Sequence, residues 1–257
     1  MGIAEALGIF AAGIGAGTIN AVVGSGSLIT FPTLLAFGFP PVTANVSNNI
    51  GLVPGNFSGA WGYRRELSGQ RRRLLWLGMF SALGSIAGAI MLLALPAGAF
   101  KLIVSGLILI SCVLVLLQPR LSARIAARRE RDGQGGTGND RGGPVLAAGV
   151  FGSGIYGGYF GAAQGVLVIG LLGSFLDESM QRINGAKNVL VGIVNGVAAV
   201  IYIIFASVSW PAVLLVAAGS TIGGLLGARI GRRLPPLVLR VIVVVIGIIA
   251  VVKLLFF

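Results

Sequence analysis

The feature that most constrains this chain is the length of its uncharged stretches. No Asp, Glu, Lys or Arg occurs between Ala6 and Tyr63, and the stretches 74–96, 144–176 and 188–228 also lack charge. Each stretch reaches the length of about 20 apolar residues that a helix needs to cross a bilayer. A mean hydropathy of +0.96 with only 10% charged residues also lies outside the range of soluble proteins. We therefore expect an all-α polytopic membrane protein.

The net charge of +12 comes from arginines that are gathered in a few short segments. Fifteen of the sixteen arginines lie in segments 64–73, 120–141 and 229–240, between apolar stretches. Short arginine-rich loops mark the cytoplasmic side of a membrane protein. We therefore expect loops 64–73, 119–143 and 229–240 to be cytoplasmic in a multi-pass protein of the cell (inner) membrane. We expect the protein to have the lipid bilayer as a partner. We do not expect it to bind nucleic acid.

Residue types that support catalysis or bind metals are scarce. The chain has no His and a single cysteine, Cys112, which lies in an apolar stretch. A membrane-embedded enzyme would need a nucleophile paired with a base, or a set of metal ligands. The sequence therefore predicts no catalytic residue, no metal and no cofactor, and we do not expect an enzyme.

An internal repeat divides the chain into two parts. The same asparagines recur at one constant offset. The aligned pairs are Asn45 with Asn184, Asn49 with Asn188, and Asn56 with Asn195. Asparagine is too scarce in apolar segments for such matches to arise often by composition alone. We expect a first transmembrane repeat at 1–118, a basic cytoplasmic linker at 119–143 and a second transmembrane repeat at 144–257.

The basic segments change places between the two repeats. Segment 64–73 carries five arginines, whereas its counterpart 203–212 carries none. Segment 94–98 is uncharged, whereas its counterpart 233–237 lies in a basic cluster. Under the positive-inside rule the two repeats then have opposite orientations, which is the inverted repeat of many secondary transporters. The alternative interpretation is that charge is placed loosely in both repeats.

We expect an inverted repeat of two five-helix units, about ten helical segments in all, some of them short or broken. The expected segments are Ile3–Val23, Leu28–Phe37, Val42–Tyr63, Leu74–Leu95 and Ala99–Leu117, followed by Val145–Ala162, Val166–Leu176, Asn184–Ala206, Pro211–Ala228 and Leu237–Phe256. The second segment of each unit is too short to span a hydrocarbon core about 30 Å thick. It is expected to form a broken hairpin with the first segment, either crossing or turning back. Both termini would then lie outside.

Each broken hairpin predicts half of an anion site. A helix N-terminus exposes unpaired N–H groups and carries about half a positive charge, and glycine lets an anion approach closely. The two breaks would face each other across one cavity at mid-membrane. The alternative is that their glycines only allow close helix packing. The predicted substrate-binding residues are Gly24, Ser25, Gly26, Ser27, Asn45, Asn49, Ala163, Gln164, Gly165, Asn184, Lys187 and Asn188.

Some of these polar residues have a second interpretation. A lysine inside a membrane segment is a functional candidate, but Lys187 could also lie near a helix end and extend its ammonium to the cytoplasmic interface. Each asparagine could instead form an interhelical hydrogen bond or cap a helix. Two pairs of glycines, Gly84 with Gly88 and Gly223 with Gly227, predict close packing inside the bundle or at a homodimer interface.

Several stretches match the motifs of one family of membrane proteins. They are "GSGSLITFPTLL", "FPPVTANVSNN", the basic central loop, and "YFGAAQGVLVIG" with "NGAKN". On these stretches the chain resembles the TauE/SafE (TSUP) sulfite exporter family over nearly its whole length. The resemblance implies transport of sulfur-containing anions, with the family's glycine runs placed at 24–27 and 161–165. In the second run, Ala162, Ala163 and Gln164 stand where glycines are common.

The sequence therefore predicts a transporter that exports a small sulfur-containing oxyanion, such as sulfite or an organosulfonate. Alternating access would occur around a mid-membrane site formed by the broken helices. The acidic residues lie outside the apolar stretches, so no proton relay of the usual kind is available. An inside-negative potential favours export of each negative charge by about 2.3 kcal/mol per 100 mV. The alternatives are an anion channel and a non-transporting membrane structural or assembly protein.

Overall fold

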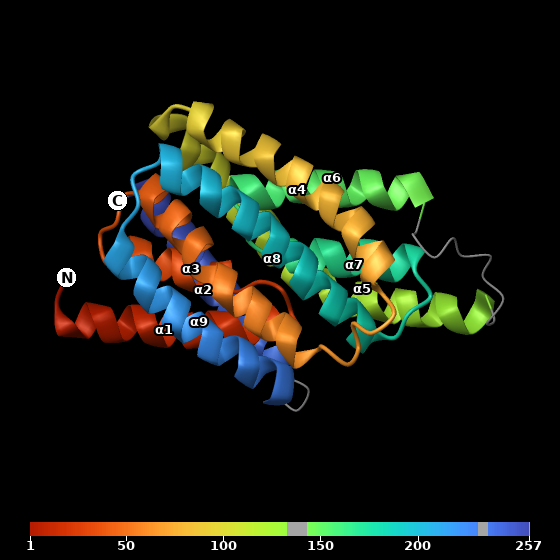
Figure 1. The fold of residues 1–257 in the computed structure, drawn as a ribbon. Coiled ribbons are helices and arrows are strands. Elements are labelled where there is room, and N and C mark those ends of the chain that lie inside the picture. The colour runs from red at the N-terminus through yellow and green to blue at the C-terminus, as the bar shows by residue number, and fades with distance from the viewer. Residues whose placement is uncertain (133–142, 231–235, 257) are drawn as a thin grey trace.

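The chain forms helices and no strands over the residues that the computed structural model describes, namely 1–132, 143–230 and 236–256 (Figure 1). The helices are α1 (Ile3–Val22), α2 (Ser27–Ala36), α3 (Pro41–Gly62), α4 (Arg71–Ala94), α5 (Ala97–Asp132), α6 (Gly143–Tyr159), α7 (Gln164–Phe175), α8 (Met180–Phe205), α9 (Trp210–Ile230) and α10 (Pro236–Phe256). Within these described ranges, five stretches are long and apolar enough to cross a membrane. They are Ile3–Val22, Arg71–Ala94, Gly98–Arg120, Met180–Phe205 and Trp210–Arg229. The expectation of an all-α polytopic membrane protein is confirmed.

The helices begin and end close to where the sequence predicted, with one clear difference. Helix α5 continues to Asp132, so the predicted linker, 119–143, begins inside a helix. Its residues 133–142 lie outside the described residues, as do residues 231–235 of the basic segment 229–240. Helices α2 and α7 have 10 and 12 residues, so each is about 15–18 Å long and shorter than the hydrocarbon core.

Close helix crossings join the two predicted repeats. Helix α1 packs on α9, and α4 packs on α6. A Cβ added to Gly17 would clash with the backbone of Ser220, and one added to Gly84 would clash with the backbone of Phe151. Small residues at these crossings let the helix backbones touch, which increases van der Waals contact between them. The glycine pairs predicted to pack closely are therefore used inside the bundle, and a homodimer remains a prediction.

The pattern of helix contacts repeats between the two parts of the chain. When each helix is exchanged for the one five positions away, the α1–α9 contact becomes the α6–α4 contact, and α3–α9 becomes α8–α4. The α3–α8 and α5–α10 contacts map onto themselves. This pattern is the one expected of two related units packed around a common axis. The opposite orientation of the units in a membrane stays a prediction.

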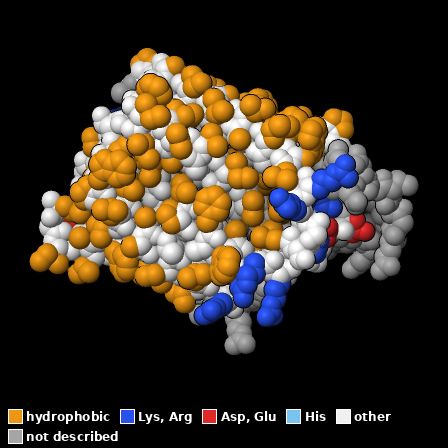
Figure 2. All heavy atoms as spheres, viewed as in Figure 1, with side chains coloured by type: hydrophobic (Ala, Val, Ile, Leu, Met, Phe, Trp, Pro, Cys, Tyr) orange, Lys and Arg blue, Asp and Glu red, His pale blue; other side chains and the backbone are white. Residues whose placement is uncertain are grey.

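The surface has an apolar belt and a basic end. Large apolar side chains on most of the described helices are exposed. They include Leu75, Leu102, Ile204, Phe205 and Leu214. Figure 2 shows apolar side chains spread over the visible face, with the Lys and Arg side chains gathered toward one end. Both termini lie at the opposite end in the same view (Figure 1). An apolar belt with basic residues at one end suits a membrane environment.

Candidate functional site

The two helix breaks meet in the interior of the bundle. The N–H of Gly165, at the start of α7, donates to the carbonyl oxygen of Gly24, between α1 and α2, at 3.0 Å. Gly24 has φ +87° and Ala163 has φ +56°, at equivalent positions of the predicted repeat. A Cβ added to Gly24 would clash with the backbone of Gly165. The two breaks are therefore in direct contact, whereas the sequence predicted that they would face each other across a cavity.

The first break is capped by the side chains of α8. Lys187 Nζ donates to the carbonyl oxygens of Asn20 at 2.6 Å and Ala21 at 3.1 Å, and Asn188 Nδ2 donates to Ala21 O at 3.3 Å. These carbonyls end α1, where backbone acceptors have no partner within the helix and the dipole favours a cation. Irregular backbone inside a membrane needs such partners. The sequence therefore places a charged cap and an amide cap on the same helix end.

The second break has neutral caps in the corresponding place. Asn45 Nδ2, on α3, donates to the carbonyl oxygen of Tyr159 at 3.0 Å, at the end of α6. Ser111 Oγ, on α5, donates to the carbonyl oxygen of Ala162 at 3.0 Å, and the hydroxyl of Tyr156 donates to the same oxygen. Each break is therefore capped by a long helix of the other unit, with a cation at the first break only.

The Lys187 side chain is held inside the bundle. Only 1% of the residue is exposed, and its ammonium ends at the α1 carbonyls instead of reaching the surface. A Cβ added to Gly165 would lie 3.0 Å from Lys187 Cδ, so the lysine stem also packs against the contact between the breaks. Among the described residues no carboxylate forms an ion pair with Lys187. A lysine without a counter-charge in a low-dielectric interior keeps its charge only with a bound anion or other strong acceptors, and otherwise gives up its proton.

Asparagines connect the helices around this lysine. Asn49 Nδ2 donates to Asn195 Oδ1 at 3.2 Å, and Asn20 Nδ2 donates to Asn56 Oδ1 at 2.6 Å. Asn20 Oδ1 also accepts the N–H of Gly26 at 3.4 Å, at the start of α2. Asn20 was absent from the predicted site. Its position in the last turn of α1, just before the glycine run, is the signal that could have identified it.

Several buried polar atoms near the breaks have no hydrogen-bond partner among the described residues. They are Ser25 Oγ, Asn45 Oδ1, Asn49 Oδ1, Gln164 Oε1 and Asn184 Oδ1. Buried polar atoms are nearly always paired in folded proteins, so a group of unpaired ones calls for an explanation. A polar ligand or water bound beside the contact of the breaks would supply the missing partners. The unpaired hydroxyl of Ser25 belongs to the first break, the one with the charged cap.

The predicted site residues are almost entirely buried. The structure buries all of them except Ser27, which is half-buried. Gly24, Gly165 and Lys187 form one contact cluster, and Gln164 Nε2 donates away from it, to the carbonyl oxygen of Ser153 at 3.1 Å. The assignment of these residues to a substrate remains a prediction.

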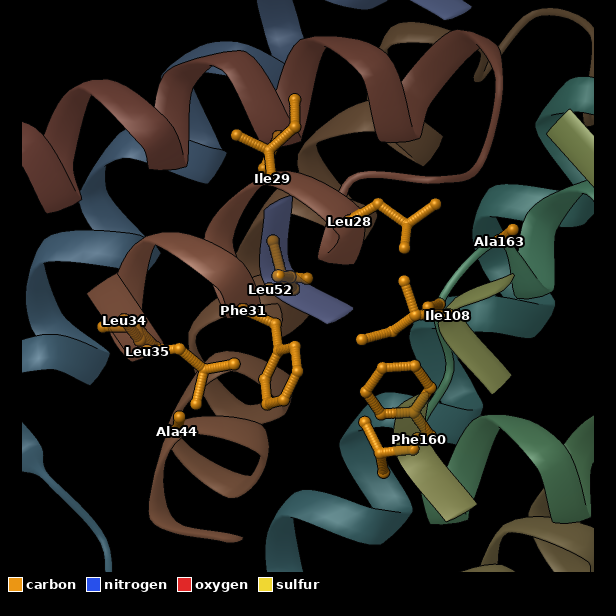
Figure 3. Close-up of a cluster of buried hydrophobic side chains, with 14 of the residues drawn as sticks. Leu28, Ile29, Phe31, Leu34, Leu35, Ala44, Leu52, Ile108, Phe160 and Ala163 are labelled. Carbon is orange, nitrogen blue, oxygen red and sulfur yellow. The ribbon is translucent and has the colours of Figure 1, made fainter. Parts of the chain in front are cut away.

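An apolar layer covers one side of the breaks. In Figure 3 the side chains of Leu28 and Phe31, from α2, face those of Ile108 and Phe160. The rings of Phe31 and Phe160 pack edge to face, with centroids 5.2 Å apart. Leu28, Phe31 and Ile108 have no exposed surface. This side of the breaks is therefore dry, so a substrate would have to approach from elsewhere or through movement of these side chains.

Ion pairs at the basic end also join the two predicted repeats. Glu178, in the loop between α7 and α8, accepts from Arg73 Nη1 at 2.8 Å and also pairs with Arg182. Partial burial raises the pKa of Glu178, but hydrogen bonds and charge from Arg182 and Arg73 outweigh it, so the pKa lies below the ordinary value. The carboxylate is therefore ionised at neutral pH and links α4 of the first unit to α8 of the second.

Comparisons with known proteins agree with this architecture. The family model described as "Sulfite exporter TauE/SafE" matches residues 9–254. A "Probable membrane transporter protein" of Haemophilus influenzae is 24% identical over 242 residues, covering 93% of this chain and 90% of the relative. The "Probable membrane transporter protein YfcA" of Escherichia coli is 24% identical over 244 residues, covering 94% and 86%. A third relative, YdhB of Bacillus subtilis, is 34% identical over 112 residues, covering 44% and 43%. No solved structure matches the chain.

Proposed function

The chain belongs to the TauE/SafE sulfite exporter family of membrane transport proteins, and on that basis we propose that it exports a small sulfur-containing oxyanion, such as sulfite or an organosulfonate. The site is the contact between the two helix breaks. The protein moves its substrate without chemical change. It lies in the cell (inner) membrane with its basic segments on the cytoplasmic side, where the positive-inside rule puts them.

The observation that carries this proposal is the buried ammonium of Lys187. It lies beside both breaks and is bonded to two carbonyl oxygens, at 2.6 and 3.1 Å. An ammonium has three donors, so one remains for a ligand. Together with the unpaired hydroxyl of Ser25, it offers donors to an oxyanion in the buried interior of the bundle. Sulfite and sulfonates present three oxygens that accept such bonds.

Transport requires the substrate to reach this site from each side in turn. The breaks touch and an apolar layer covers them, so the described conformation is closed at its centre. We propose that the two units rock against each other around the breaks, as in transporters built from inverted repeats. Because no described carboxylate is buried near the site, the membrane potential is the proposed driving force for export.

Ligand-induced stabilisation of the purified protein tests the site directly. A ligand that binds the folded state at 100 times its Kd raises the free energy of unfolding by about 2.7 kcal/mol. We expect sulfite, thiosulfate or a sulfonate to raise the thermal midpoint in detergent, with acetate and chloride giving smaller shifts. The same midpoint with every one of these anions would contradict the proposal and would favour a structural or assembly role.

Two lysines of similar bonding allow a matched comparison. Lys187 caps the end of α1, and Lys253 Nζ caps the end of α2 by donating to Ala36 O at 3.0 Å, but at an exposed position. We expect Lys187→Gln to abolish anion-induced stabilisation and to reduce anion flux in proteoliposomes at least tenfold, while Lys253→Gln leaves both near wild type. Equal flux in the two variants would remove Lys187 from the site.

Flux kinetics separate a carrier from a channel. In proteoliposomes with an imposed potential, a carrier that rocks between two states saturates with substrate, because each cycle moves one substrate through a slow conformational step. We expect saturation of sulfite flux and acceleration of efflux by the potential. Flux that rises in proportion to concentration over the whole accessible range would instead support an anion channel.

A further inference from the structure

A groove with a volume of about 480 Å³ lies between α5 and α7. Its walls are mainly apolar and include Leu114 and Leu117 of α5 and Leu167 and Leu171 of α7. Leu117 is exposed, and Leu114, Leu167 and Leu171 are half-buried. In a chain that spans a bilayer, such a groove on the apolar belt is open to lipid chains.

One end of this groove is polar. Arg120 and Ser174 both line it, and both are exposed. Ser111 of α5 touches Ala162, just before α7, and the lining residues of both helices follow that contact in the sequence, so both helices run from it along the groove. Arg120 is nine residues beyond Ser111, about 14 Å along the helix. The groove therefore extends from an apolar region beside the second break to a guanidinium and a hydroxyl at the basic end.

We propose that this groove binds an anionic phospholipid, with one acyl chain against the leucines and the phosphate at Arg120. Arginine binds phosphate oxygens through two parallel N–H donors, and Ser174 Oγ can donate a further bond. Basic pockets between membrane helices on the cytoplasmic side are known to select anionic lipid headgroups. The charge of Arg120, at the start of basic segment 120–141, favours an anionic headgroup over a zwitterionic one, whose cationic group it would repel.

The bound lipid has a structural consequence for the site. Val166 lines the groove and lies one residue beyond Gly165, whose N–H bonds to Gly24. A lipid chain in the groove therefore packs on the first turn of α7 and stabilises the contact between the breaks. The two ends of α7 then depend on the same lipid, the first through its acyl chain and the last through its headgroup.

Lipid titration of the full-length protein tests the proposal. The protein, purified in an uncharged detergent, is titrated with phosphatidylglycerol or with phosphatidylcholine of the same acyl chains. Bound lipid is counted by native mass spectrometry, and the thermal midpoint is read in parallel. We expect phosphatidylglycerol to be retained and to raise the midpoint by at least twice the shift given by phosphatidylcholine.

Variants on each part of the groove identify the contacts. We expect Arg120→Gln to remove the difference between the two lipids, and Leu167→Trp or Leu117→Trp, which fill the groove, to remove retention of phosphatidylglycerol. Arg229→Gln changes an exposed arginine outside the groove, and Leu214→Trp adds the same bulk to an exposed residue of α9. Both control variants should keep the wild-type preference.

Two results would overturn the proposal. One is equal retention of the two lipids by the wild type, or a preference that survives Arg120→Gln. The other is a dimeric protein that retains neither lipid and becomes monomeric on Leu167→Trp, which would show that a second copy of the chain occupies the groove. Because Arg120 and Leu117 are exposed, their replacement is not expected to unfold the protein.

Discussion

The two helix breaks solve one structural problem with different chemistry. Both leave carbonyl oxygens at a helix end inside the bundle, and both have a residue with positive φ at the same repeat position, Gly24 in the first and Ala163 in the second. The first break is capped by the ammonium of Lys187 and the amide of Asn188. The second is capped by the amide of Asn45 and by hydroxyls.

This difference shows which features the architecture needs and which are specific to one break. Capped carbonyls and a left-handed residue occur in both, so they belong to any helix that is interrupted inside a membrane. The charge occurs once. A neutral cap would have satisfied the same carbonyls, as it does at the second break, so the cost of burying an ammonium has to be explained by something other than helix capping. An anionic substrate is that explanation in the proposed function.

The largest effect is expected where the two breaks touch. Gly24→Ala places a Cβ against the backbone of Gly165 at a positive φ, which combines overpacking with a left-handed alanine. We expect a loss of about 3 kcal/mol or more in the free energy of unfolding, read as a large fall in the thermal midpoint in detergent. Gly196→Ala, at a helical glycine with open space around it, should be neutral or stabilising. A Gly24→Ala protein of wild-type stability would show that the breaks do not touch.

The capped carbonyl oxygens of the two breaks differ in how many side-chain donors they have, so loss of one donor should cost different amounts of stability. Asn45→Leu removes the amide donor from Tyr159 O and leaves that buried oxygen unpaired, at a cost of about 1–3 kcal/mol. Asn188→Leu removes one of two donors to Ala21 O, since Lys187 still donates to it, so we expect a smaller loss of about 1 kcal/mol or less. Denaturant titration of the two variants measures this order. The reverse order would mean that the first break depends on its amide more than on its ammonium.

The alanine of the second break predicts a stabilising substitution. Ala163 has φ +56° and ψ +17°, a conformation that costs an L-residue with a Cβ roughly 1–2 kcal/mol relative to glycine. We expect Ala163→Gly to raise the stability by about 1 kcal/mol once the greater freedom of glycine in the unfolded chain is allowed for. Ala162→Gly, at a neighbour without positive φ, should only destabilise. Thermal unfolding of both variants decides whether the two breaks share a backbone conformation.

The smallest effect is expected at the ion pairs that join the units at the basic end. Because the folded pKa of Glu178 lies below the ordinary value, its ionised form stabilises the folded chain above about pH 4.3. This contribution is lost as the pH falls through the folded pKa. We expect Glu178→Gln to cost under about 1 kcal/mol at pH 7 and nothing at low pH. Asp177→Asn, at an exposed neighbour, is the control, and a cost for Glu178→Gln that persists at low pH would exclude the ion pair as its cause.

The helices could be predicted from the sequence because each long stretch of uncharged, apolar residues predicts a membrane-spanning helix. Even the short α2 and α7 were expected, since glycines interrupt the apolar stretch just before each of them. The partners of the polar residues could not be predicted in the same way. The bond from Lys187 to Asn20 joins residues far apart in the sequence, and the direct contact of Gly24 with Gly165 depends on how two units dock. The extension of α5 to Asp132 was missed because charged residues there suggested a loop, although Arg, Ala and Glu all favour helices.

The crossing of α1 with α9 has a consequence for how the chain is made. The glycine face of α1 reaches the bilayer well before α9, the helix that covers it, leaves the ribosome. Until α9 is inserted, the glycine face of α1 therefore contacts lipid or the translocon instead of its partner helix. A chain terminated before α9 would keep the glycine face of α1 uncovered. Such a fragment would not fold as an independent unit and would be a substrate for membrane quality-control proteases.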